Sequence, residues 1–254
     1  METTPDIDRA APWRRLLRAA LILLILVAVI VTAYVQTIIP PILVFAVLFV
    51  VALFLLSRAG TPRTVGTVIG GIGSLLFMLG NLPFVIEDLQ HPESFLPFLA
   101  TGMGVVGAIL GFVAMLGALF KWSGAPTRAL MAIGGAAVVL FAAVGLVSTL
   151  GVESDEREDG DIVVVAEKVD FFLEGDDPER SADAEVTLGA GAAVFVDNKD
   201  LFGHNFTVEA LDIEVDLPAN TARRIVVDAD PGEYEFVCTI EGHEEDMAGT
   251  LVVE

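Results

Sequence analysis

The sequence predicts a multi-pass α-helical membrane domain followed by an all-β sandwich. The chain has 254 residues and is 54% hydrophobic, with a mean hydropathy of +0.71, yet its formal net charge is −21. A division at Gly151 separates these properties, because residues 1–150 carry eight Lys and Arg against six Asp and Glu, whereas residues 151–254 carry six against twenty-nine. The first part therefore has the composition of a membrane domain, and the second that of an acidic soluble domain.

Five membrane spans are expected in residues 19–150. No charged residue occurs from Ala19 to Ser57, and at about 1.5 Å per helical residue this 39-residue run is nearly twice the thickness of a bilayer core. The adjacent Pro40 and Pro41 disfavour helix just before them and divide the run into two. The expected spans lie near residues 19–38, 41–57, 65–85, 95–119 and 129–150.

The basic residues of the loops predict the orientation, because such residues are retained on the cytoplasmic side. Four arginines lie in residues 1–18, two more follow the second span, and Lys121 and Arg128 precede the fifth, whereas residues 87–94 contain no Lys or Arg. Residues 1–18 are therefore expected on the inner side of the cytoplasmic (plasma) membrane, and the acidic domain on the outer side. A single tilted helix across the 39-residue run is the alternative. It would place Arg58 and Arg63 on the outer side, against the distribution expected for basic loop residues.

The membrane domain shows no sign of a task beyond anchoring in the lipid bilayer. Ionisable residues inside a membrane usually mark function, and none lies well inside an expected span. Glycines at 66 and 70, and at 107 and 111, have the spacing that lets helices approach closely. They predict packing within the chain, with a homo-oligomer as the alternative.

The acidic part begins with a linker and continues as a β domain. Residues 151–160, GVESDEREDG, predict a solvated linker. Residues 161–254 contain seven or so short β-branched or aromatic segments separated by turn signals. Alternation in EYEFVC places Tyr234, Phe236 and Cys238 on one face of a strand, and the whole pattern is typical of a β-sandwich.

The small number of cysteine and histidine residues limits which kinds of metal site the chain can form. Cys238 is the only cysteine, so neither an intramolecular disulfide nor a dinuclear copper centre with two cysteine bridges can form. The three histidines, His91, His204 and His243, are too few for a multicopper oxidase, and structural zinc would normally need a fourth N or S ligand. The remaining site is a mononuclear copper centre with two imidazoles, one thiolate and a weak axial thioether. Its ligands would be His204, Cys238, His243 and Met247, the last three spaced as C-x4-H-x3-M.

Three segments of the acidic domain resemble the cupredoxins, the blue copper family of azurin, plastocyanin and halocyanin. They are NKDLFGHNFTV (198–208), PGEYEFVCTIEGH (231–243) and M-x-G-T-L-V-V (247–253). The resemblance covers residues 161–254 and implies a Greek-key β-sandwich with one type 1 copper ion.

The resemblance also implies roles for residues beside the four ligands. The Gly203 carbonyl would approach copper from the opposite axis, and the Asn205 amide would hydrogen-bond to the Cys238 sulfur. His243 would be the port through which electrons enter and leave. No catalytic residue is implied.

The function expected from these observations is that of a membrane-anchored carrier of single electrons, and not of an enzyme. Its partners would be redox proteins such as a cytochrome or a terminal oxidase; no nucleic-acid partner is expected. Acidic residues at 241 and 244–246 around His243 predict either a basic partner or a high-salt habitat. The alternatives are a module that holds or senses copper and a copper-free scaffold.

Overall fold

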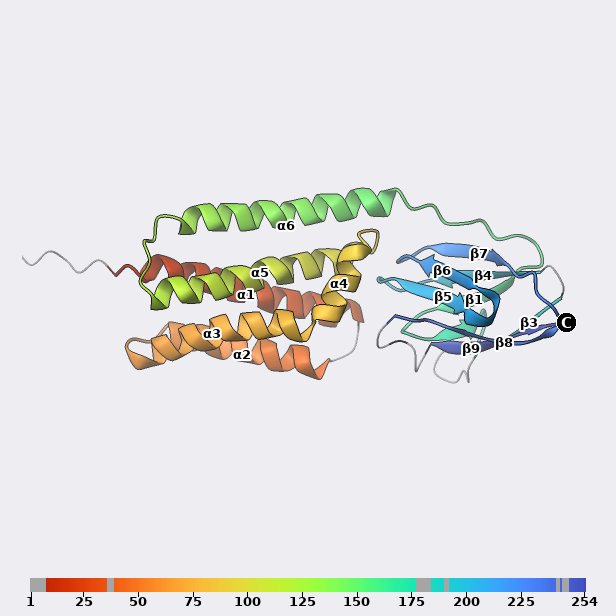
Figure 1. Ribbon diagram of the computed structural model, residues 1–254, viewed down its shortest axis with the longest axis horizontal. Coiled ribbons are helices and arrows are strands. Elements are labelled where there is room, and N and C mark those ends of the chain that lie inside the picture. Colours follow the sequence, from red (N-terminus) through yellow and green to blue (C-terminus); the bar gives the residue numbers. More distant parts are fainter. Residues whose placement is uncertain (1–7, 36–38, 177–183, 190–191, 241–242, 244–246) are drawn as a thin grey trace, which may run out of the picture. The chain divides into compact units, whose positions relative to one another are not determined.

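The computed structural model describes residues 8–35, 39–176, 184–189, 192–240, 243 and 247–254. The chain divides into two compact units, one of residues 1–90 with 97–144 and one of residues 91–96 with 145–254. The first unit is helical and the second is mostly β-structure (Figure 1).

The described part of the helical unit contains five long apolar helices and one short helix. These are α1 (Ala11–Val35), α2 (Pro40–Leu56), α3 (Thr61–Gly80), α4 (Leu82–Gln90), α5 (Phe95–Leu119) and α6 (Thr127–Leu150). The predicted break at the two prolines is present, because α2 begins at Pro40. A proline is well tolerated at the first position of a helix, where the N–H that it lacks would have no partner within the helix. Helix α1 begins earlier than its expected span, and the Arg18 guanidinium donates to the Leu56 carbonyl at the end of α2 (2.7 Å).

The expected span at 65–85 is wrong at its end, because the structure divides it into α3 and α4. Helix α3 ends at Gly80, and Asn81 caps it by donating from its side-chain amide to the Phe77 carbonyl (2.7 Å). The cause lies in the next residues, since Pro83 has no N–H with which to continue α3, whereas a proline is tolerated in the first turn of a new helix such as α4.

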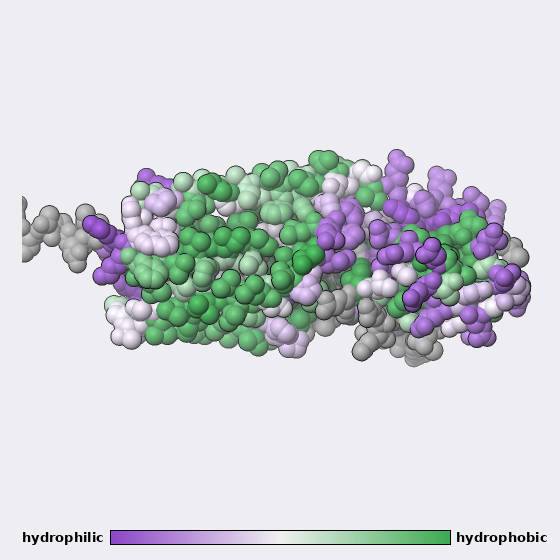
Figure 2. All heavy atoms as spheres, viewed as in Figure 1, coloured by the Kyte–Doolittle hydropathy of each residue, from purple (hydrophilic) through white to green (hydrophobic). Residues whose placement is uncertain are grey.

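Four helices of the described chain are long and apolar enough to cross a membrane, namely α1, α3, α5 and α6. Helix α2 is shorter, with 17 residues, but this is still within the range of about 17–25 that can span a hydrocarbon core. Figure 2 shows hydrophobic residues over most of the visible surface of the helices, which is the surface a bilayer would cover.

The spaced glycines serve packing within the chain. A Cβ atom on Gly66 would lie 2.9 Å from the Ala52 carbonyl oxygen of α2, and one on Gly107 would lie 3.0 Å from the Leu24 side chain of α1. A Cβ on Gly70 would lie 3.0 Å from the Leu21 side chain of α1, and one on Gly111 would lie 2.5 Å from the Ser74 hydroxyl of α3. The expected packing within the chain is thus present, and a homo-oligomer through these faces would require the same contacts to open.

The β unit consists of two sheets that enclose one core. Their strand orders are β2-β1-β4-β7 and β3-β9-β8-β5-β6. The strands are β1 (Ile162–Ala166), β2 (Phe171–Leu173), β3 (Ala184–Leu188), β4 (Ala193–Asn198), β5 (His204–Val208), β6 (Ile213–Leu217), β7 (Ala222–Val226), β8 (Gly232–Val237) and β9 (Ala248–Val253). The predicted sandwich is confirmed.

The structure has more strands than the seven or so expected. The first predicted segment is a hairpin of β1 and β2 with a turn at residues 167–170, and β6 pairs with β5 after a left-handed residue, Asp212. The alternation predicted for EYEFVC is present, because Phe236 and Cys238 are fully buried and Tyr234 packs against the same core.

Three aromatic rings fill the centre of the sandwich. Phe206 and Phe236 are stacked with centroids 4.7 Å apart, and Phe171 meets Phe236 edge-on at 5.6 Å. All three side chains are fully buried. Phe206 lies two residues after His204, and Phe236 two residues before Cys238, so the same core fixes the backbone on both sides of the candidate site.

The predicted linker is partly docked rather than fully solvated. The Asp155 amide donates to the Ala222 carbonyl (3.1 Å), and the Arg224 amide donates to the Asp155 carboxylate (2.9 Å). The Arg224 guanidinium also binds both oxygens of Asp161, at 2.9 and 3.0 Å. The acidic segment therefore lines the edge strand β7, and its acidic side chains contact Arg224, one of the few arginines of the domain.

Candidate metal centre

Cys238 lies directly after β8, where its side chain turns into the core and is fully buried. Its backbone N–H donates to the Met247 carbonyl (2.9 Å), and the Met247 N–H donates to the His243 carbonyl (2.9 Å). A further hydrogen bond from the His243 N–H to the Ile240 carbonyl (2.9 Å) closes a turn within the same loop. These backbone hydrogen bonds bring three residues of the C-x4-H-x3-M sequence to one end of the sandwich.

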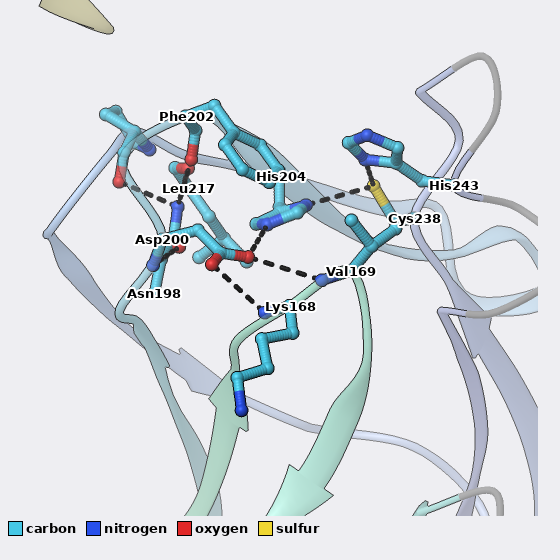
Figure 3. Close-up of polar contacts among 10 residues, drawn as sticks. Lys168, Val169, Asn198, Asp200, Phe202, His204, Leu217, Cys238 and His243 are labelled. Carbon is cyan, nitrogen blue, oxygen red and sulfur yellow. Dashed lines mark hydrogen bonds and ion pairs between the residues drawn. The ribbon is translucent and has the colours of Figure 1, made fainter. Parts of the chain in front are cut away.

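His204 joins this loop from the first residue of β5. Its Nδ1 atom is 3.9 Å from the Cys238 Sγ, and the Nδ1 atom of His243 is 3.7 Å from the same sulfur (Figure 3). The three possible ligand atoms all lie within 4.8 Å of one another. The structure thus brings together three residues that the sequence analysis selected from separate segments.

The distances fit a trigonal metal site. With metal–sulfur and metal–nitrogen bonds of about 2.3 and 2.05 Å, as zinc makes, an angle of 120° separates sulfur and nitrogen by about 3.8 Å. The observed 3.7 and 3.9 Å bracket this value. Two imidazoles and one thiolate in this arrangement are the donor set of a blue copper centre.

Met247 is fully buried and belongs to the same core cluster as Cys238. Its backbone is fixed to Cys238 by the hydrogen bond described above. The position is consistent with an axial thioether, and ligation by Met247 stays a prediction. The acidic residues at 241 and 244–246 lie outside the described residues.

Asn205 and Gly203 flank His204. The Asn205 side chain accepts a hydrogen bond from the Thr239 N–H (2.7 Å) and donates to the Thr239 hydroxyl (2.8 Å). This pairing ties β5 to the residue that follows Cys238. The roles implied for the Asn205 amide at the Cys238 sulfur and for the Gly203 carbonyl remain predictions.

The environment keeps His243 neutral. Burial and, to a smaller extent, the neighbouring His204 lower the pKa of His243, and with the opposing effect of Asp200 the pKa is about 4. Neutral imidazole is the form that binds a metal, so His243 needs no proton loss at neutral pH. His243 is partly exposed, whereas His204 is buried, so His243 is the candidate ligand that reaches the surface.

Asp200 lies behind His204 and was not predicted from the sequence. The Asp200 Oδ2 is 2.9 Å from the Nε2 of His204, on the side of the ring away from Cys238 (Figure 3). The one signal in the sequence is a carboxylate four residues before a predicted ligand, and this spacing has no fixed meaning outside a helix.

Part of the β unit matches a known family of domains. Residues 173–253 match the family model described as a cupredoxin-like domain. Among solved structures, a Cu(I) form of an amicyanin variant has 22% identity and a TM-score of 0.30, covering 39% of this chain and 87% of that chain. An oxidised amicyanin variant has 24% identity and a TM-score of 0.31, covering 40% of this chain and 89% of that chain. No curated protein matches the chain. The β unit of this protein therefore contains a cupredoxin-like domain at residues 173–253.

Proposed function

We propose that this protein is a membrane-anchored carrier of single electrons with one type 1 copper ion. The observation that carries the proposal is the cluster of His204, Cys238 and His243 at distances that fit a trigonal copper site. Bound copper would supply a one-electron Cu(II)/Cu(I) couple. Met247 would be the weak axial ligand.

The residues of the chain would keep the site nearly unchanged during electron transfer. Two of the ligands, His204 and Cys238, are buried and held by the aromatic core, and the loop of His243 is closed by backbone hydrogen bonds. A site that needs little rearrangement suits both oxidation states. Electrons would pass through His243, which is partly exposed and lies beside the Phe202 ring, with centroids 5.8 Å apart.

The proposed location is supported by the apolar helices and the charge distribution. We propose five crossings of the cytoplasmic membrane, with residues 1–18 inside, the membrane domain at 19–150 and the copper domain at 161–254 outside. An outward domain anchored in this way would have a high local concentration near membrane-bound redox partners, such as a cytochrome or a terminal oxidase. No step of this proposal requires a catalytic residue, so we do not assign an enzymatic activity.

The test uses the purified full-length protein in detergent. We expect added Cu(II) to produce an intense blue thiolate-to-copper absorption band and a paramagnetic resonance spectrum with narrow hyperfine splitting. The matched control is Cys238→Ser, which keeps the size of the side chain and removes the thiolate, and both signals should be lost. Ordinary tetragonal Cu(II) signals in the unmodified protein would refute the blue copper site.

The same sample distinguishes an electron carrier from a module that holds copper as cargo. A carrier should keep its copper through repeated reduction and oxidation, with the blue band returning each time. Release of the metal on reduction would favour copper holding or sensing.

A further inference from the structure

A buried carboxylate lies directly behind the candidate ligand His204. The Asp200 side chain is 11% exposed, the His204 side chain is 0% exposed, and their Oδ2 and Nε2 atoms are 2.9 Å apart. The opposite ring nitrogen of His204, Nδ1, faces the Cys238 sulfur (Figure 3). The imidazole therefore bridges the carboxylate and the candidate metal position.

The loop that carries Asp200 is held from several sides. The Asp200 N–H donates to the Asn198 Oδ1 (2.9 Å), and its carbonyl accepts from the Asn220 N–H (3.1 Å). The buried Asn198 amide in turn donates to three backbone carbonyls, those of Phe202, Leu217 and Pro218. These hydrogen bonds fix the backbone of Asp200, so the fold sets the point from which its side chain reaches His204.

The turn between β1 and β2 supplies two more hydrogen bonds to this carboxylate. The N–H groups of Lys168 and Val169 donate to Asp200 Oδ1 (3.0 Å) and Oδ2 (3.4 Å). Both turn residues have positive φ, 59° and 60°, and the Glu167 N–H bonds to the Asp170 carbonyl (3.1 Å) across the turn. Two-residue turns of this kind prefer Asn-Gly, and a β-branched residue at positive φ is a genuine outlier.

An observed backbone outlier of this kind points to a functional constraint. The unusual turn aims two backbone N–H groups at the carboxylate that contacts His204. These N–H groups stabilise the charged form. Although burial raises the pKa of Asp200, the hydrogen bonds from His204 and from the Lys168 N–H more than offset this effect and leave the pKa lowered.

We propose that Asp200 is a positioning residue that accepts the Nε2 hydrogen of His204, directs the Nδ1 lone pair toward Cys238, and favours Cu(II) over Cu(I) by its buried negative charge. The effect on the two oxidation states of copper rests on the proposed function. Carboxylates behind metal-bound histidines fix the tautomer and the ring orientation and make the ligand more basic. A more basic ligand and a nearby negative charge both stabilise the more highly charged oxidation state.

The first test measures the reduction potential of the copper-loaded full-length protein. Asp200→Asn removes the charge at constant size, and we expect the affinity for Cu(II) to fall about 10- to 100-fold, as for other residues that support metal ligands. The reduction potential should therefore rise, by about 59 mV for each tenfold loss of Cu(II) affinity relative to Cu(I), because copper is a one-electron couple.

The matched control is Asp216→Asn, which makes the same change at an exposed position of β6, the strand that pairs with β5. Solvent and salt screen such a charge, so its potential should stay close to that of the unmodified protein. Equal potentials for Asp200→Asn and the unmodified protein would overturn the proposal.

The second test needs no copper. The chain has only three histidines, so ¹⁵N-histidine labelling of the metal-free full-length protein gives three readily assigned rings. We expect His204 to carry its hydrogen on Nε2 in the unmodified protein, with slow exchange, and to populate both tautomers in Asp200→Ala. A His204 hydrogen on Nδ1 in the unmodified protein would overturn the proposal even if the variant fails to fold or to bind copper. An unchanged tautomer in folded Asp200→Ala would also overturn it. If the unmodified protein binds no copper, the proposed function fails, and the tautomer still decides the role of Asp200.

Discussion

Gly249 in β9 lies under the aromatic core, and Gly249→Ala should destabilise the whole sandwich. Gly249 is paired with Phe236 on one side and with Ala184 on the other. An added Cβ would lie 2.5 Å from the Ala184 carbonyl oxygen and still closer to the Phe236 ring. The carbonyl belongs to the β3 backbone, and the ring is stacked on Phe206, so neither neighbour can move without disturbing other contacts.

The surroundings of Gly249 determine how much free energy of unfolding the substitution should cost. Overpacking of a well-filled core typically costs about 1–3 kcal/mol, and two immobile neighbours place this substitution near the upper value. A loss of about 3 kcal/mol corresponds to roughly 100-fold faster exchange of amides that open only with the domain. Because β9 begins at Ala248, directly after Met247, we also expect the candidate metal loop to exchange faster.

Hydrogen exchange of the full-length protein, measured on peptides from β3 and β9, checks this prediction. The control is Gly189→Ala, since a Cβ at Gly189 would meet no atom within 4 Å and should change the free energy of unfolding by less than about 0.5 kcal/mol. Exchange in Gly249→Ala as slow as in Gly189→Ala would refute the steric reasoning.

Two further predictions concern the candidate metal site. In the metal-free protein, His243 should titrate near pH 4, and because the unfolded chain takes up this proton near pH 6.5, the domain should lose up to about 3 kcal/mol of stability as the pH falls from 6.5 to 4. The ¹⁵N chemical shifts of His243 in folded and in urea-unfolded protein measure its two pKa values. A pKa in the folded protein at or above that in the unfolded chain would show that burial does not disfavour the charged imidazole. Asn205→Ala removes both hydrogen bonds to Thr239 and should cost about 1–2 kcal/mol, with a broader copper resonance spectrum. Thr239→Ser keeps the hydroxyl and the N–H, so it serves as the control, and equal stability of the two variants would count against the pairing.

The sequence was sufficient for the main division of the chain and for the candidate ligands. Composition alone separates an apolar part from an acidic one, because a membrane and water select different side chains over long stretches. The residues His204, Cys238 and His243 were also predictable, since the chain has so few cysteines and histidines and the loop spacing is local. The structure brings their donor atoms together as expected.

The sequence did not predict the end of the third helix, the β6 strand or the docking of the acidic segment on β7. Pro83 explains the end of the third helix, but a proline can either kink a helix or end it, and the sequence does not say which. The docking of Asp155 and Asp161 depends on Arg224, more than sixty residues away, and no local pattern of charge indicates that partner.

Asp200 shows most clearly what only the tertiary structure decided. Its residue type and its spacing from His204 are visible in the sequence, but its charge is stabilised by N–H groups of Lys168 and Val169, about thirty residues earlier. These groups reach it because a strained turn at one sheet meets the loop before β5. The sequence by itself determined which residues could bind a metal, because that property belongs to side-chain chemistry. The fold decided which of them is held, oriented and charged, because those properties depend on contacts between distant segments.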